Sequence, residues 1–393
     1  MSVRSALPSA LDVDAFDIGR RGFLAVVTVG TLLGLGALGV AFPGSIFGTL
    51  LEVIFAKGTI GSALRRSTPI VLAAIGGIFA EKSGVINIGL EGLLIISAFT
   101  AIYAMDLSNN LWIAFFAAVL ASTLLAALFA VVCIEFRADQ IIAGLAVWLI
   151  ALGLAPFASQ VVYGAPNTDS VRTPPGMNEV LEGLPVVGGT VSSVGGLVGD
   201  GLTFVADLPV IGGLFHASVV VVVGALVEAD VGVYLMFLMV AISWYLLYRT
   251  RFGRWVRASG ENPKALDTAG VSVTRVRYTA VLLSGVFSGM GGAALSLSLG
   301  QFTGNGQTMV NGKGFIAIVA YLFGNYNPVG AFFSTLLFGG LDAIQTSLQN
   351  VDIGVPSPLV RVIPFVMVIV VLALVGRTRI PSAAGEHYES GEE

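Results

Sequence analysis

Long apolar runs constrain this chain more than any other feature of its sequence. A membrane-spanning helix needs roughly 17–25 mainly apolar residues, and most of the apolar runs reach that length while two are shorter. The expected spans are residues 22–42, 69–80, 85–105, 111–134, 140–163, 231–248, 278–300, 314–324, 328–349 and 359–376. Because the runs are continuous and do not alternate, they exclude a transmembrane β-barrel. The sequence therefore predicts an all-α polytopic membrane protein with about ten transmembrane segments, of which 69–80 and 314–324 are short.

Composition supports this class and excludes several kinds of site. Only 11% of the residues are charged, whereas soluble domains carry about 25%. The single cysteine, Cys133, leaves no disulfide framework and no cysteine-based metal site, and the two histidines lie far apart in the chain. No Gly-x-x-x-x-Gly-Lys-Ser/Thr phosphate loop occurs. We therefore expect no metal, no cofactor and no ATP site in this chain, no nucleic-acid partner and no enzymatic activity.

The positions of Lys and Arg predict which loops face the cytoplasm. Cytoplasmic loops carry an excess of these residues. With ten crossings and a cytoplasmic N-terminus, most of the 20 basic residues fall on the inner side, and the loop 249–277 is the richest in them. We expect both termini inside, with a cytoplasmic segment 1–21, a transmembrane domain 22–376 and an acidic, unstructured tail 377–393. Arg65 and Arg66 would then lie on the outer side of the membrane. The sequence gives no reason for this placement unless residues 48–66 form an interfacial helix.

An enlarged loop, residues 164–230, is expected on the outer side. Prolines and glycines are too dense between residues 164 and 213 for a helix to continue, and Arg172 is the one basic residue in that stretch. The apolar stretch 214–227 is short for a full crossing. We expect it to be buried or interfacial, and its place relative to the membrane is open.

The two short segments are the architectural signal for a translocation pathway. Each contains glycine and leads through a short turn into a long span, and interrupted segments at matching places in two halves indicate such a pathway. An ordinary glycine-kinked helix is the alternative. Candidate pathway residues are the polar side chains in or beside these apolar segments: Asn87, Glu91, Gln301, Asn305 and Asn311.

Carboxylates within the membrane offer a second class of function. Such groups are typical of proton- or sodium-coupled carriers, and Glu91 and Asp342 are the candidates here. Both lie near a predicted membrane edge, and no Lys or Arg lies in the middle of a predicted span to pair with them. Structural hydrogen bonds from Asn87 or Glu91 to the backbone are the simpler interpretation. An ion-coupled secondary carrier is kept as the alternative.

The loop 249–277 carries the strongest local signal. Gly260 and the pair Asn262-Pro263 end one helix, Asn262 can cap a new helix, and Pro263 suits its first position. This short helix then ends at Gly270, a residue type that favours helix ends. A stiff helix beneath a membrane domain can serve as a mechanical contact for a cytosolic partner, while a basic connector with a local helix is the alternative.

Two stretches of the sequence resemble a known family. They are residues 79–93, Phe-Ala-Glu-Lys-Ser-Gly-Val-Ile-Asn-Ile-Gly-Leu-Glu-Gly-Leu, and residues 260–270, Gly-Glu-Asn-Pro-Lys-Ala-Leu-Asp-Thr-Ala-Gly. Both resemble permease subunits of ABC importers for nucleosides and simple sugars, a group allied to ribose and branched-chain amino acid permeases. The stretches 312–318 and 324–330 resemble the C-terminal half of the same family. The resemblance runs from about residue 60 to 376, although the outer region around 214–230 is enlarged.

The resemblance implies a function and a set of partners. It implies a non-catalytic, multi-pass permease subunit of the cell membrane that pairs with a second, identical or homologous permease. Two ABC ATPase subunits would use the ATP, and an external substrate-binding lipoprotein would deliver the solute. The segment 260–270 resembles the coupling helix that docks on the ATPase, with Glu261, Asn262, Pro263 and Lys264 at the contact turn. Neutral amides in the pathway suit an uncharged polar solute, either a nucleoside or, as the alternative, a simple sugar.

Overall fold

The computed structural model describes residues 42, 44–174, 221–306, 308–349 and 379–389, and the structural statements below concern these residues. Their regular structure is helical, with one isolated β-bridge between Asn167 and Thr303. The chain divides into two compact units: residues 1–56 with 345–377, and residues 57–344 with 378–393. The first unit contributes α2 (Ile46–Ile54). The second unit holds the candidate site and is described here by itself.

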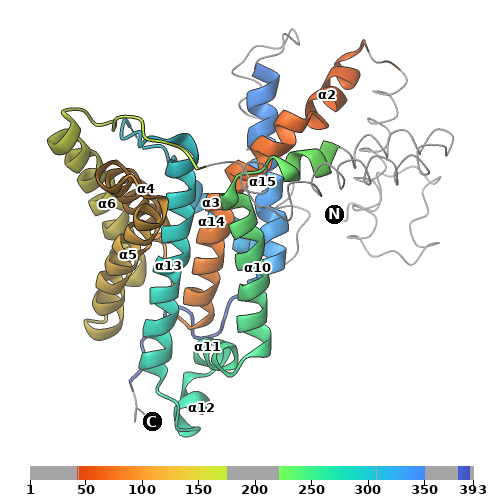
Figure 1. Cartoon of the computed structure of the whole chain (residues 1–393). Helices are drawn as coiled ribbons and strands as arrows, with labels where there is room; N and C mark the ends of the chain where they lie inside the picture. Colours follow the sequence, from red (N-terminus) through yellow and green to blue (C-terminus); the bar gives the residue numbers. More distant parts are fainter. Residues whose placement is uncertain (1–41, 43, 175–220, 307, 350–378, 390–393) are drawn as a thin grey trace, which may run out of the picture. The chain divides into compact units, whose positions relative to one another are not determined.

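Seven helices in the described chain are long and apolar enough to cross a membrane. They are α3 (Lys57–Lys82), α4 (Leu90–Ser108), α5 (Leu111–Ala130) with its π-helical continuation η3 (Val131–Glu135), α6 (Gln140–Tyr163), α10 (Val231–Arg249), α13 (Val273–Leu299) and α15 (Pro328–Gln349). Three shorter helices are α11 (Arg251–Glu261), α12 (Pro263–Thr268) and α14 (Lys313–Phe323) (Figure 1). The all-α membrane class is confirmed. The predicted spans 22–42 and 359–376 lie outside the described residues, so the count of ten stays a prediction.

The prediction of a short segment at 69–80 is wrong. These residues form the second half of α3, which has 26 residues and carries Pro69 inside it. The apolar run looked short because Arg65 and Arg66 interrupt it. In the structure α3 continues through both arginines, and Arg66 Nη1 lies 2.5 Å from Asp342 Oδ2 of α15. The other short segment, 314–324, is confirmed as the 11-residue helix α14.

α13 is the central helix of the larger unit (Figure 1). It packs closely on its neighbours through small residues, as membrane helices commonly do. A Cβ added at Gly289 would lie 2.8 Å from the Cα of Val119 on α5, and one added at Gly292 would lie 2.4 Å from the carbonyl oxygen of Leu94 on α4. Larger side chains at these two positions would therefore push the helices apart.

The loops of the larger unit meet in two groups at opposite ends of its helices. At one end, residues 167–171 exchange backbone and side-chain hydrogen bonds with residues 300–304. At the other end, Gly84 and Gly260 accept backbone hydrogen bonds from residues 383–385. We call the latter the α12 end. The two groups coincide with the loops predicted on the outer and the inner side. The sequence predicted an unstructured tail over residues 377–393. This prediction is wrong for residues 379–389, which pack against the α12 end.

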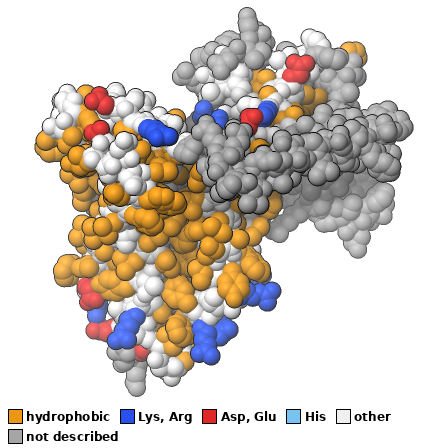
Figure 2. Space-filling model, viewed as in Figure 1, with side chains coloured by type: hydrophobic (Ala, Val, Ile, Leu, Met, Phe, Trp, Pro, Cys, Tyr) orange, Lys and Arg blue, Asp and Glu red, His pale blue; other side chains and the backbone are white. Residues whose placement is uncertain are grey.

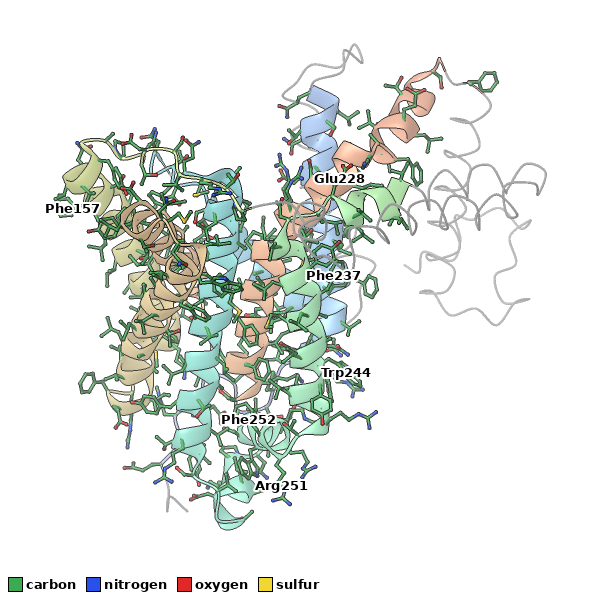
Figure 3. The ribbon with its side chains drawn as sticks, viewed as in Figure 1. Phe157, Glu228, Phe237, Trp244, Arg251 and Phe252 are labelled. Atoms are coloured by element: carbon green, nitrogen blue, oxygen red, sulfur yellow. The ribbon has the colours of Figure 1, made fainter. Side chains whose placement is uncertain are left out.

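The surface of the larger unit matches a lipid environment. On the face shown in Figure 2, hydrophobic side chains cover the helices between the two ends, and Lys and Arg gather at the lower end, where α11 and α12 lie. Figure 3 shows Phe157 at the outside of α6, and this side chain is 65% exposed. The described end of the apolar stretch 214–227, residues 221–227, is helical.

Candidate translocation and coupling site

Two irregular segments of the described chain, 83–89 and 300–312 apart from residue 307, connect helices of the larger unit. The Asn87 amide donates to Ser284 Oγ at 2.8 Å, and a Cβ at Gly76 would lie 2.9 Å from the carbonyl oxygen of the same Ser284. Asn87 therefore lies beside Gly76, more than one turn before the end of α3, and it is 1% exposed. Irregular backbone at membrane depth occurs where protein or a water-filled cavity surrounds it. This arrangement is typical of interrupted helices in transporters.

Glu91 holds the start of the short helix α14. Its Oε1 accepts the N–H of Gly312 at 2.7 Å and its Oε2 accepts the N–H of Gly314 at 2.6 Å. These N–H groups have no partner within the helix itself, and the positive end of a helix favours a carboxylate. Glu91 is 2% exposed. Its carboxylate is therefore a structural cap between α4 and α14.

The five predicted pathway residues fall into two groups. Asn87 and Glu91 are buried, and Asn311 lies directly before Gly312, so its exposed side chain belongs near Glu91. Gln301 and Asn305 are also exposed, but they lie at the end opposite α12, where the neighbouring Gly300 and Gly304 bond to residues 167–171. The structure thus places Asn87 and Glu91 in the buried interior with the exposed Asn311 next to the Glu91 cap, and the other two residues at the far end.

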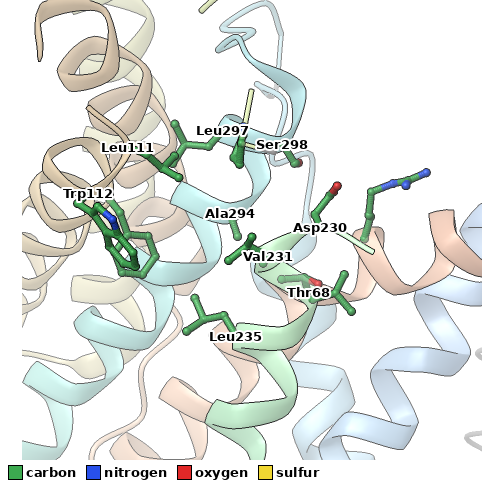
Figure 4. Close-up of a pocket in the computed structure, with 14 residues that line it drawn as sticks. Thr68, Leu111, Trp112, Asp230, Val231, Leu235, Ala294, Leu297 and Ser298 are labelled. Carbon is green, nitrogen blue, oxygen red and sulfur yellow. The ribbon is translucent and has the colours of Figure 1, made fainter. Parts of the chain in front are cut away.

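A cavity of about 430 Å³ lies near the end opposite α12, between α3, α5, α10 and α13 (Figure 4). Its lining is mainly apolar, with the rings of Trp112 and Phe115 on one side. The polar groups on its wall are Arg65, Asp230 and the hydroxyls of Thr68 and Ser298. Burial raises the pKa of Asp230, and the nearby Arg65 charge opposes that shift. The volume is within the usual range for small-molecule pockets, although none of the five predicted pathway residues lines it.

The turn between α11 and α12 has the geometry that its sequence predicts. Asn262 Oδ1 accepts the N–H of Ala265 at 3.0 Å, and Pro263 occupies the first position of α12. Gly270 follows the helix with a φ of 80°. Glu261 and Lys264 are exposed beside this turn. The short helix is thus held at both ends by local contacts and leaves charged side chains available to a partner.

Gly260 fixes α11 against the end of α3. A Cβ at this position would lie 2.4 Å from the carbonyl oxygen of Lys82. The neighbouring Ser259 Oγ donates to the carbonyl of Ser83 at 2.7 Å. These two contacts hold α11 directly against the end of α3.

Sequence reasoning missed a polar cluster that connects α3 with α14. The buried Glu81 carboxylate accepts hydrogen bonds from the hydroxyls of Tyr321 and Tyr326, the latter at 2.9 Å. Burial and this carboxylate together raise the pKa of Tyr326, which lies in the turn after α14. The Lys82 ammonium lies 5.7 Å from the centre of the Tyr326 ring. Polar contacts thus join the end of α3 to α14 and to the turn that follows it.

The signal for this cluster was present in the sequence. Glu81 and Lys82 follow the apolar run 69–80 directly, and Tyr326 lies in the stretch 324–330 that carries the family resemblance. Because α3 runs through Lys82, Glu81 belongs to the helix rather than to a turn. The Asp342 carboxylate, the other candidate for ion coupling, is paired with Arg66.

The chain was compared with known proteins. The model of the family described as "Branched-chain amino acid transport system / permease component" matches residues 59–372. The guanosine ABC transporter permease protein of Bacillus subtilis is 33% identical over 84% of this chain and 96% of its own length. The nucleoside ABC transporter permease protein of Lactococcus lactis is 32% identical over the same shares. The glucose ABC transporter permease protein of Haloferax volcanii is 28% identical over 88% of this chain and 84% of its own length.

No solved structure matches the chain. The matched family and the relatives are permease components rather than enzymes. The seven apolar helices agree with a multi-pass protein of the plasma membrane. With four fifths of the chain covered by the family model, the chain belongs to the branched-chain amino acid transport system permease family.

Proposed function

We propose that this chain forms the translocation pathway of an ATP-driven importer for a nucleoside. The observation that carries the proposal is the Asn262-capped helix α12, which presents exposed charged residues at one end of a bundle of membrane-length helices. A permease without a nucleotide site of its own needs such a contact to receive work from a separate ATPase. In this assembly the chain pairs with a second permease, two ABC ATPase subunits and an external substrate-binding lipoprotein.

The α12 end faces the cytoplasm in this proposal, with both chain termini on the same side. Arg137, Lys82 and the basic loop 249–277 meet at that end, and an excess of Lys and Arg marks cytoplasmic loops. The meeting of these loops in one group supports the predicted orientation. The acidic tail then lies on the same cytoplasmic surface as α12.

The nucleoside assignment is supported by the names of two relatives at more than 30% identity. Exposed amides suit such a solute, because ribose hydroxyls and base edges need neutral donors and acceptors. Asn311, Asn305 and Gln301 supply them, whereas Asn87 and Glu91 are engaged in structural hydrogen bonds. A simple sugar is the second candidate, favoured by the glucose permease among the relatives.

The test is uptake by the assembled complex in proteoliposomes. With ATP inside the vesicles and the cognate external protein outside, radiolabelled guanosine should accumulate, and unlabelled glucose in excess should not compete. Uptake of glucose without guanosine uptake would replace the nucleoside with a sugar. Uptake that persists without the ATPase subunits and collapses with a proton or sodium ionophore would show an ion-coupled carrier instead.

A further inference from the structure

The C-terminal segment 379–389 is built into the α12 end of the larger unit. Pro381 and Ala383 are buried, and the segment follows the surface formed by α11, α12 and the cytoplasmic-loop residues around Gly84 and Arg137. Its acidic composition predicted a free tail, yet backbone and side-chain groups along its length have partners in other elements. A C-terminal extension that only added charge to the protein surface would need no such partners.

One set of contacts joins the segment to the coupling elements. The Tyr388 hydroxyl donates to Asp267 Oδ2 of α12 at 2.9 Å. The N–H of Ala383 donates to the carbonyl of Gly260 at 2.8 Å, and Ser382 Oγ donates to the Glu261 carboxylate at 3.2 Å. These bonds reach both sides of the turn that Asn262 forms.

A second set joins the same segment to the transmembrane helices. The N–H of Gly385 donates to the carbonyl of Gly84, directly after α3, at 3.0 Å. Arg277 of α13 is 4% exposed, and its Nη1 donates to the carbonyl of Glu386 at 2.6 Å. Arg137, between η3 and α6, lies 2.7 Å from Glu389.

The two sets alternate along eight residues. Ser382, Ala383 and Tyr388 contact the coupling elements, whereas residue 386 contacts α13 and residues 385 and 389 contact the loop residues Gly84 and Arg137 beside α3 and α6. A short segment with fixed contacts on both sides cannot follow one side without pulling on the other. α12 is only six residues long, and the Tyr388 bond adds a contact from outside to the local contacts at its two ends.

We propose that residues 379–389 act as a strap that transmits movement of α12 to α3, α13 and the start of α6. The inference rests on the proposed function, in which α12 receives the movement of an ATPase. Tyr388 and Arg137 are positioning residues of this device. Without the strap, α12 follows the ATPase while the membrane helices respond only through their own contacts and chain connections with α11 and α12, and ATP is hydrolysed with less transport.

The experiment measures solute transported per ATP hydrolysed by the complex in proteoliposomes. Tyr388→Phe removes one hydroxyl and its bond to the Asp267 carboxylate. We expect the ratio to fall about threefold or more, because a hydrogen bond to a charged group contributes more than a neutral one. The matched control is Tyr163→Phe, which removes a tyrosine–aspartate bond of 3.1 Å to Asp106 at the opposite end and should leave the ratio unchanged.

A charge exchange provides a second variant that does not depend on Tyr388. Arg137→Glu places two carboxylates together and should lower the ratio, and adding Glu389→Arg should restore at least half of the loss. A general effect on folding would lower the amount of complex and would not be rescued in this pairwise way. The ATPase subunits should co-purify with every variant.

Two results would overturn the strap. They are an unchanged transport ratio in both Tyr388→Phe and Arg137→Glu at normal abundance, or a reduced ratio in Arg137→Glu that Glu389→Arg does not improve. Absence of ATP-dependent uptake by the wild-type complex would contradict the proposed function and this inference with it, whereas unchanged variants in an active complex contradict the strap alone.

Discussion

At the scale of single residues, the Glu91 carboxylate has the clearest chemical role, because both of its oxygens accept backbone N–H groups of α14. A glutamine could accept only one of these bonds, and its amide group would face the second N–H donor. The Gly314 backbone also contacts Glu91 so closely that a Cβ there would lie 2.4 Å from the Glu91 nitrogen. The start of α14 therefore lies directly against Glu91.

We expect Glu91→Gln to lower the free energy of unfolding by about 1–3 kcal/mol, since one buried donor loses its charged acceptor. Denaturant unfolding in detergent, followed by circular dichroism, measures the loss. Glu228→Gln is the control, because its ion pair with Lys57 is exposed and should contribute less than about 1 kcal/mol. Wild-type stability combined with abolished uptake would contradict the capping role and favour an ion-coupling carboxylate.

Sequence reasoning found Asn87 and Glu91 but not their partners. Ser284, Gly312 and Gly314 lie far along the chain from them, and nothing in a local pattern predicts which distant backbone approaches. Glu81 was passed over for a similar reason. It follows the predicted span, so its burial between Tyr321 and Tyr326 became visible only once α3 was seen to continue through Lys82.

At the scale of secondary-structure elements, some elements were predictable from neighbouring residues, whereas others depend on contacts with distant parts of the chain. α12 was predictable because its cap, its first proline and its stop at Gly270 are neighbours in sequence. The length of α3 was not, because Arg66, one of the two arginines that interrupt its apolar run, is paired with Asp342 of α15, which is distant in the sequence. The strap had no periodic pattern to reveal it, since its contacts are made by a short segment of turns and irregular backbone.

Gly260→Ala tests the direct contact between α11 and α3. The added Cβ would meet the Lys82 carbonyl, which is backbone and cannot turn aside. We expect a loss of about 1–3 kcal/mol in stability, as for other overpacked positions, together with reduced transport. Gly58→Ala is the matched control, because a Cβ there meets nothing within 4 Å. Thermal unfolding of both purified variants measures this loss. Equal unfolding midpoints for the two variants would show that α11 can move away from α3 freely.

At the scale of the whole molecule, the orientation can be tested by cysteine labelling. Cys133 is buried, so Cys133→Ala gives a suitable background. Ser170→Cys lies at the end opposite α12 and should react with an impermeant maleimide in intact cells, whereas Lys264→Cys should react only after the cells are opened. Both positions are exposed, so access to the reagent decides the result. Labelling of Lys264→Cys in intact cells would reverse the orientation and remove α12 from the ATPase side.

The Glu261 carboxylate tests the coupling assignment for the assembled transporter. It is the last residue of α11 and is exposed beside Lys264. Glu261→Lys therefore gathers like charges at the turn that meets the ATPase. Like-charge contacts at an interface can cost several kcal/mol of association, so we expect loss of ATPase co-purification and of uptake.

This variant should reach the membrane normally, because it adds a basic residue to a loop that is already basic and lies outside every span. Asp169→Lys is the control, an equal charge reversal at an exposed position near the opposite end. It should leave assembly and uptake unchanged. Glu389 cannot serve as that control, because its pairing with Arg137 belongs to the strap. Wild-type uptake by Glu261→Lys at normal abundance would show that the segment 260–270 is only a connector, and the ATPase would then have to dock elsewhere on the α12 end.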